Sequence, residues 1–313
     1  MDKLIILKTS AFRVIQWLLS RVVVIYLVMF LFALTCVDLK MLDMRVKTRH
    51  LNDSIPDFSD MIIFSKDFNA KNNLDWKPYK KYFELILSYM PEDNISQQLL
   101  GFVDYYSGQE QKSMALFKNS SVFNGQPLFW PNYNLGVIYY KKGMWPQAAE
   151  YLLKAISANP KLTVLLMENS IIYRQIAASS FFKYSLGDSI MEAQSKAYIL
   201  LLASFYSLGQ YDKMILISKI AIENQNLSYK DAFYYYAGIA FLKMGQPQKA
   251  FLLFQKSLSI EKDNPDIYYY IANIYQDAGQ LQQARDYLQA SYALHQKNDP
   301  RFPYENQVNL LFF

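Results

Sequence analysis

Glycine recurs at a nearly fixed interval through most of this chain, and that interval constrains the fold more than any other feature. Gly108, Gly143, Gly209, Gly245 and Gly279 follow one another at spacings of 35, 66, 36 and 34 residues, and 66 is close to two periods of 34. Each of these glycines lies between two stretches of helical character. A fixed period of this length indicates stacked helix pairs, each of which buries its apolar face against its neighbours.

Small and large residues recur at matched offsets from these glycines. Small residues occur seven positions before the glycine and five after it, at Gly101, Gly136, Gly238, Ala272, Ala148, Ala250 and Ala284. Large residues occur four before and nine after, at Tyr139, Phe205, Phe241, Tyr275, Leu152, Phe254 and Leu288. Small residues let two helices approach closely, and glycine accepts the positive φ that ends a helix. The offsets therefore predict helical hairpins with a turn at each glycine.

The clearest copy runs from Tyr133 to Pro160 and resembles the tetratricopeptide repeat. The residues that match its signature are Asn134, Leu135, Gly136, Tyr139, Gly143, Ala148, Ala155 and Pro160. The resemblance covers about two thirds of the chain. It implies an all-α fold, a right-handed α-solenoid over residues 76–298. The expected copies lie near 94–127, 129–162, 195–228, 231–264 and 265–298, with a degenerate copy at 163–194.

An apolar segment at 14–37 predicts a single transmembrane helix ahead of the solenoid. Its only charge is Arg21, and at about 1.5 Å per residue the stretch from Trp17 to Val37 covers roughly the ~30 Å hydrocarbon core. Trp17 and Arg21 are expected at the membrane interface. A basic head at 1–13 precedes the helix, and a juxtamembrane linker at 38–75 follows it.

Two alternatives stay open for this segment. A cleaved signal peptide has a similar pattern, and Phe32 to Cys36 resembles the end of a bacterial lipoprotein signal with an acylated cysteine. The orientation is balanced, because four basic residues lie on each flank: Lys3, Lys8, Arg13 and Arg21 against Lys40, Arg45, Lys47 and Arg49. Our expectation is a single-pass protein of an inner or plasma membrane, with the C-terminal domain outside the cytoplasm.

Charge and composition argue against several classes of function. The net charge is +5, but residues 51–313 carry 24 bases (32−8) and 24 acids (27−3), so the solenoid has no excess of positive charge for nucleic acid. The sequence has one cysteine, Cys36, and two histidines, His50 and His295, far apart in the chain. We therefore expect no metal, no cofactor and no enzymatic activity.

The resemblance implies that the first helix of each pair lines a concave, protein-binding groove. The positions carried over from the family are Phe102, Tyr105, Trp130, Tyr133, Tyr140, Lys141, Tyr206, Tyr235, Lys243, Tyr269 and Asn273. Tyrosine suits such a surface because its large ring ends in a hydrogen-bonding tip. Tyr133, Tyr140 and Tyr235 are the expected anchors. The alternative is that many of the 26 tyrosines pack between repeats.

These features together predict a membrane-anchored scaffold or assembly factor, whose partners are other proteins and membrane lipid. The alternative is a stoichiometric subunit of a membrane complex, with the transmembrane helix packed on other spans. The family's lysine and asparagine clamp for a C-terminal carboxylate does not occur at the groove positions. Tyr79 to Met90 is expected to cap one end of the solenoid, and residues 299–313 are a cap or a docking peptide.

Overall fold

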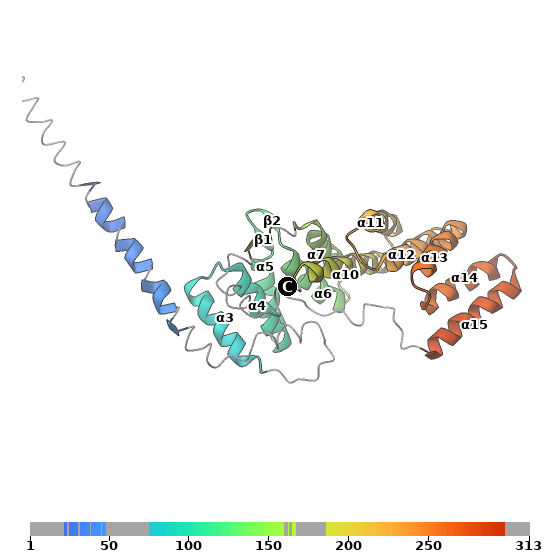
Figure 1. Ribbon diagram of the computed structural model, residues 1–313, viewed down its shortest axis with the longest axis horizontal. Coiled ribbons are helices and arrows are strands. Elements are labelled where there is room, and N and C mark those ends of the chain that lie inside the picture. The colour runs from blue at the N-terminus through green and yellow to red at the C-terminus, as the bar shows by residue number, and fades with distance from the viewer. Residues whose placement is uncertain are drawn as a thin grey trace, which may run out of the picture.

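The computed structural model describes residues 22–47 except 24, 31, 38 and 45, then 75–159, 162, 165–166 and 186–297. Helices follow one another along the long axis of the molecule (Figure 1). Their bounds are α3 Lys77–Tyr89, α4 Asn94–Tyr106, α5 Glu110–Asn119, α6 Phe129–Lys141, α7 Trp145–Ser157, α10 Leu186–Ser207, α11 Tyr211–Glu223, α12 Lys230–Lys243, α13 Pro247–Ile260, α14 Pro265–Asp277 and α15 Leu281–Lys297. The expected head, most of the linker, much of the degenerate copy and residues 299–313 lie outside the described residues.

The helices form hairpins that turn at the predicted glycines. The pairs are α4/α5, α6/α7, α10/α11, α12/α13 and α14/α15, and φ at the five turn glycines lies between +67° and +78°. The residue after each glycine donates its backbone N–H to the carbonyl four residues before the glycine, as Met144 does to Tyr139 at 3.0 Å and Gln246 to Phe241 at 2.9 Å. This bond is the Schellman closure of a helix, so the period in the sequence is the period of helix ends.

The small residues before the turns allow close contact between the two helices of a pair. A Cβ atom placed on Gly136 would lie 2.6 Å from Cγ of Leu152, and one on Gly238 would lie 2.6 Å from Cε1 of Phe254. Leu152 and Phe254 are completely buried. The predicted pairing of a small residue with a large one across each hairpin is therefore confirmed for these two repeats.

Enlarging the small side of a hairpin is expected to destabilise it. Gly136→Leu or Ala148→Leu places a larger side chain against a filled core, at a cost of about 1–3 kcal/mol in the free energy of unfolding. Thermal unfolding of the purified chain measures the loss. Ala115→Leu, at an exposed position of α5, is the matched control. Equal melting temperatures for Ala148→Leu and Ala115→Leu would contradict the packing.

The helix α3 covers the N-terminal side of the first pair. Its buried residues Tyr79, Tyr82, Phe83 and Ile86 belong to the continuous hydrophobic core, and α3 packs on α4. Lys80 adds an ion pair with the buried carboxylate of Asp104, at 2.5 Å. The solenoid is therefore closed on this side, as expected from the helical character of Tyr79 to Met90.

Two local features differ from the expectation. A two-stranded antiparallel hairpin, β1 Val122–Phe123 with β2 Gln126–Pro127, connects α5 to α6, and it turns at Asn124 and Gly125 with φ of +49° and +77°. Positive φ at both turn residues is what an Asn-Gly hairpin turn requires. In addition, α10 begins nine residues before the expected copy at 195, so its first residues belong to the expected degenerate copy. The helix α7 packs directly on α10.

The N-terminal helix is long and apolar enough to cross a membrane. It runs from Ile25 to Met44 with a mean hydropathy of 2.0, and none of its most apolar stretch is buried against the rest of the protein. A signal sequence meets the same criteria of length and composition. The helix continues past Val37, where the sequence analysis ended it, and the expected interface residues Trp17 and Arg21 lie outside the described residues.

The far end of this helix contacts the solenoid. The Tyr89 hydroxyl donates to the Asp43 carboxylate, and Lys47 Nζ donates to both groups, at 2.9 Å to Tyr89 and 2.8 Å to Asp43. Met44, between these two charged residues, is 1% exposed. The end of α3 is therefore held to the end of the N-terminal helix by several polar contacts, next to the buried Met44.

Candidate protein-binding surface

The predicted groove residues that reach solvent lie on the first helices of the pairs. We call the exposed side of α4, α6, α10, α12 and α14 the first-helix face. Tyr206 on α10 is 38% exposed, and Tyr269 on α14 is 49% exposed. The other predicted positions with exposed or partly exposed side chains are Tyr105, Tyr140, Lys141, Lys243 and Asn273. These residues are available for contact with another molecule.

Four of the predicted groove residues are buried: Phe102, Trp130, Tyr133 and Tyr235. Phe102 packs edge-on against Trp76 of α3 at 6.0 Å between ring centroids, and is completely buried. Trp130 and Tyr133 pack around Phe129, with centroid distances of 4.9 and 5.7 Å. Every residue of α6 from Phe129 to Tyr139 is buried. The part of α6 that contains Trp130 and Tyr133 is therefore enclosed, and only the end of the helix at Tyr140 and Lys141 reaches solvent.

Tyr133 shows how completely this region is enclosed. Burial holds the pKa of its hydroxyl well above the usual value, with smaller contributions from Tyr106, Glu192 and Tyr229. Its hydroxyl and the indole N–H of Trp130 have no hydrogen-bond partner within the described ranges of the chain. Tyr133, an expected anchor, is therefore a core residue.

A tyrosine cluster extends over the three consecutive first helices α10, α12 and α14. The Tyr235 ring lies 6.3 Å from the Tyr270 ring, and Tyr270 lies 6.0 Å from Tyr269. Burial raises the pKa of Tyr270 to about 12, and Tyr206 is close enough to contribute to this shift. Tyr235 is 8% exposed, so it supports the cluster from below, while Tyr206 and Tyr269 form its exposed part.

Tyr270 connects this cluster to the core. Its ring stacks on Phe254 of α13, with centroids 5.6 Å apart and planes at 9°. The sequence analysis did not select Tyr270, although the run Tyr268-Tyr269-Tyr270 must direct its rings to different sides of a helix. The signal for Tyr270 is the triplet itself, which places the exposed ring of Tyr269 next to a partly buried one.

One carboxylate lies beside the cluster. Burial raises the pKa of Asp266 at the start of α14, and His295 and a hydrogen bond from Tyr235 oppose that rise. The distance from His295 Nε2 to Asp266 Oδ1 is 3.9 Å. The cluster therefore combines apolar ring surface with hydroxyl groups and one partly buried acid.

A second group of predicted residues lies on α4 and α6. Burial raises the pKa of the Tyr105 hydroxyl, which lies near the ion pair between Glu110 and Lys142. Tyr140 packs edge-on against Trp145, at 5.0 Å. Lys141 has an exposed side chain, yet desolvation lowers its pKa. Nearby protein atoms therefore surround part of the ammonium group, while the rest of the side chain is accessible to solvent.

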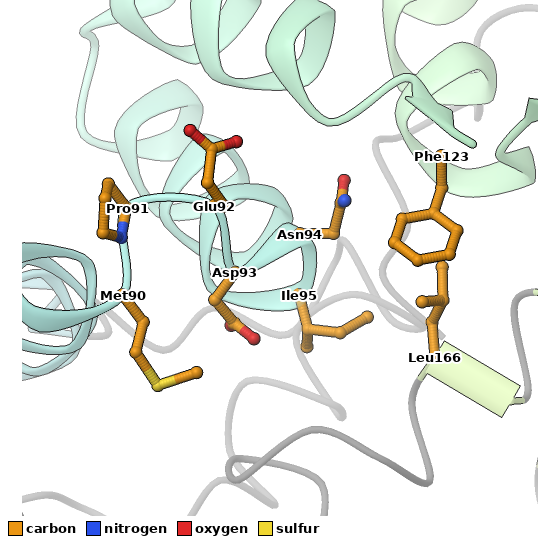
Figure 2. Close-up of a pocket in the computed structure, with 8 residues that line it drawn as sticks. All are labelled: Met90, Pro91, Glu92, Asp93, Asn94, Ile95, Phe123 and Leu166. Atoms are coloured by element: carbon orange, nitrogen blue, oxygen red, sulfur yellow. The ribbon is translucent and has the colours of Figure 1, made fainter. Parts of the chain in front are cut away.

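A pocket of about 300 Å³ lies away from these residues, where the turn between α3 and α4 meets the β-hairpin (Figure 2). Its lining residues are Met90, Pro91, Glu92, Asp93, Asn94, Ile95, Phe123 and Leu166. The side chains of Glu92 and Asp93 point in opposite directions (Figure 2). Asp93 accepts the N–H of Ser96 at 2.7 Å and so caps α4, which gives it a structural role.

A metal site in a protein usually needs at least three histidine, cysteine, aspartate or glutamate side chains close together. Within the part of the chain that the structure describes, no three of them lie close enough together to hold a metal ion. Cys36 is exposed on the N-terminal helix.

Comparison with known proteins adds to the repeat assignment. Two segments match the tetratricopeptide repeat family, residues 131–162 and 241–302. No protein with a curated description shows significant sequence similarity to the chain. Solved structures of similar fold include the two described next. The crystal structure of MamA has 17% identity, covers 63% of this chain and 95% of its own, and gives a TM-score of 0.47. A putative kinesin light chain of Podosopora anserina with nearly identical TPR-like repeats has 18% identity, covers 66% and 96%, and gives 0.41.

The matched segments contain α6/α7 and α14/α15, together with α13 and the end of α12. These are the copies whose turn glycines and small residues fit the signature most closely. The chain therefore carries tetratricopeptide repeats.

Proposed function

We propose that this protein is a membrane-anchored scaffold or assembly factor that binds another protein through its first-helix face. The observation that carries the proposal is the tyrosine cluster, in which Tyr206 and Tyr269 are exposed, Tyr235 is buried and Tyr270 is partly buried. Rings held in place by neighbouring rings lose little freedom on binding, and they offer both apolar area and a hydroxyl group. This is the composition of a protein-binding hot spot.

The charge of the solenoid favours a protein partner over nucleic acid. Its bases and acids balance, and many lysines are already paired with carboxylates, as in Lys80 with Asp104, Lys142 with Glu110 and Lys154 with Glu150. Phosphate recognition requires a concentration of free positive charge. We therefore assign affinity to the tyrosine rings and assign no catalytic role to the chain.

The N-terminal helix is proposed to be the anchor, with lipid around its exposed apolar surface. We expect the full-length protein to stay in the membrane pellet after an alkaline wash and to dissolve only in detergent. Val28→Arg together with Phe32→Arg puts two charges in the middle of the helix, at about 2.5–3.5 kcal/mol each, and should release the protein. Glu84→Arg, on the exposed part of α3, controls for the added charge.

The intact mass of the mature protein separates an anchor from a signal sequence. An anchor keeps residues 1–47, whereas a signal peptide is removed and a lipoprotein begins at an acylated Cys36. Added protease should digest the solenoid from outside the cell, because we propose that the C-terminal domain lies outside the cytoplasm. If the solenoid resists the protease until the membrane is opened, the C-terminal domain lies on the cytoplasmic side instead.

The partner can be identified by affinity capture of the full-length protein in detergent, followed by mass spectrometry. If the protein is a scaffold or assembly factor, the capture should recover its partner in substoichiometric amounts. The partner should then dissociate on dilution. A complex of fixed stoichiometry that survives detergent through the N-terminal helix would instead indicate a structural subunit.

A further inference from the structure

The carboxylate of Asp266 lies beside the exposed part of the tyrosine cluster. Asp266 is in the first turn of α14, three residues before Tyr269 and four before Tyr270, so the three side chains share one face of the helix. Asp266, Tyr206 and Tyr269 all act electrostatically on the hydroxyl of Tyr270, which shows that these groups lie around it. The Asp266 side chain is 39% exposed. A molecule bound at the exposed rings can therefore also reach this carboxylate.

Asp266 has room for another hydrogen-bond donor. Among the residues that the structure describes, no lysine or arginine lies within ion-pair distance of it, and the basic group at that distance is His295 of α15. The 3.9 Å between His295 Nε2 and Asp266 Oδ1 is too long for a hydrogen bond. A carboxylate has about four acceptor positions, and the hydrogen bond from Tyr235 uses one of them. Acceptor positions therefore remain for a ligand.

Partial burial makes the charged form of this carboxylate costly. Loss of water raises the pKa of Asp266, and neither His295 nor the hydrogen bond from Tyr235 reverses that rise. Elsewhere the fold neutralises such an acid itself, since Lys80 lies 2.5 Å from the buried carboxylate of Asp104. Asp266 has no such internal cation. A cation supplied from outside would stabilise its charged form, because the group has already lost part of its hydration.

Acidic side chains outnumber basic ones where α12 and α14 begin. The acids are Asp231, Glu261, Asp263 and Asp266, and the lysines are Lys230 and Lys262. Lys230 is already used, because its ammonium group donates to the carbonyls of Ala221 and Ile222 at the end of α11, at 2.7 and 2.9 Å. The excess of negative charge attracts basic ligands and repels acidic ones.

We propose that Asp266 and the exposed tyrosines bind a basic side chain, an arginine or a lysine, of the protein partner. This assignment rests on the proposed function, because Asp266 belongs to the same first-helix face. The charge of the ligand is placed at the Asp266 carboxylate, next to the ring of Tyr269. The negative face of a tyrosine ring also attracts a cation, so the ring and the carboxylate select the same group. Arginine fits best, because its planar group stacks on a ring while it donates hydrogen bonds.

Two peptides that differ in charge test the proposal. One is acetyl-Gly-Arg-Gly-amide, and the other has citrulline, which has nearly the shape of arginine but is neutral. Their binding to the full-length protein in an uncharged detergent is measured by ligand-detected NMR. We expect the arginine peptide to bind in the millimolar range and Asp266→Asn to weaken it about fivefold, the effect of removing one partly exposed ion pair. Asp266→Glu keeps the charge and should retain most of the affinity.

Asp212→Asn is the matched control. Asp212 is the acid in the first turn of α11, as Asp266 is in α14, but it lies on a second helix. Both substitutions remove an acid from the positive end of a helix, so their effects on thermal unfolding should be similar. Equal binding of the two peptides, no binding at about 10 mM arginine peptide, or equal weakening by Asp212→Asn would overturn the proposal.

The captured partner separates the basic side chain from the proposed function. If Asp266→Asn weakens binding of the partner and of the arginine peptide alike, both proposals are supported. If Tyr206→Ala and Tyr269→Ala weaken partner binding while Asp266→Asn leaves it unchanged, the first-helix face binds a protein without using a basic side chain. If all three variants bind the partner normally, the first-helix face is not the binding surface, and both proposals are wrong.

Discussion

Replacing Tyr206 and Tyr269 by alanine is expected to weaken partner binding by about 2 kcal/mol or more for each true anchor, which is about thirtyfold in affinity. These two residues are the exposed part of the tyrosine cluster, and neighbouring rings support both: Tyr269 lies 6.0 Å from Tyr270, and Tyr206 lies 6.5 Å from Tyr211. The measurement is the dissociation constant for the captured partner, with wild-type and variant proteins purified in the same detergent.

Exposed leucines on the second helices provide the controls for this experiment. Leu216 on α11 and Leu252 on α13 are 58% and 59% exposed, so Leu216→Ala and Leu252→Ala remove apolar surface from the other face. They should leave affinity unchanged. If these two variants abolish binding while both tyrosine variants bind normally, the partner uses the second-helix face or the N-terminal helix, and the subunit alternative becomes the better description.

Phe254→Ala is expected to cost about 3–5 kcal/mol of stability, the range for truncating a fully buried aromatic residue. The ring fills the space beside Gly238, stacks on Tyr270 and lies 6.4 Å from Tyr235, so its loss leaves a cavity beneath the tyrosine cluster. Urea or thermal unfolding measures the loss. Partner binding should also weaken, because Tyr270 loses its support.

Leu252→Ala again serves as the control, two residues away on the same helix. It should change stability by no more than about 0.5 kcal/mol, because its side chain already lies in solvent. Similar losses for Phe254→Ala and Leu252→Ala would show that α13 is turned differently about its axis, and the pairing of Gly238 with Phe254 would then be wrong.

The hairpins could be predicted from the sequence because the information that specifies them is local. A turn glycine, a small residue seven positions earlier and a large residue nine positions later all belong to one helix pair. Gly136 with Leu152 and Gly238 with Phe254 show this directly, since each pair of residues meets within a single hairpin. Short-range geometry of this kind depends little on the rest of the chain.

The candidate surface was harder to predict because exposure depends on neighbouring repeats. Trp130 and Tyr133 occupy positions that line a groove in the related family, but here every residue of α6 from Phe129 to Tyr139 is buried. Exposure of Tyr206 and Tyr269 likewise depends on how α10, α12 and α14 are stacked. A single-repeat signature contains no information about the following repeat, so it cannot separate an exposed ring from one that the next pair covers.

The β-hairpin between α5 and α6 could have been recognised. Asn124-Gly125 is a strong short-range signal for a two-residue turn, and Val122 and Phe123 before it favour strand. The repeat register does not predict the hairpin, because the hairpin lies between two copies of the repeat. Its position between two pairs leaves the helical stacking on each side intact.

The contact of Tyr89 with Asp43 and Lys47 has a mechanical consequence. It lies at one end of an elongated body, so the solenoid behaves as a lever whose pivot is this group of side chains (Figure 1). A small rotation at the pivot becomes a large displacement of α14 and α15, because displacement grows with distance from the pivot. Under the proposed membrane anchoring, residues that never touch a partner would thus set how far from the bilayer the solenoid extends.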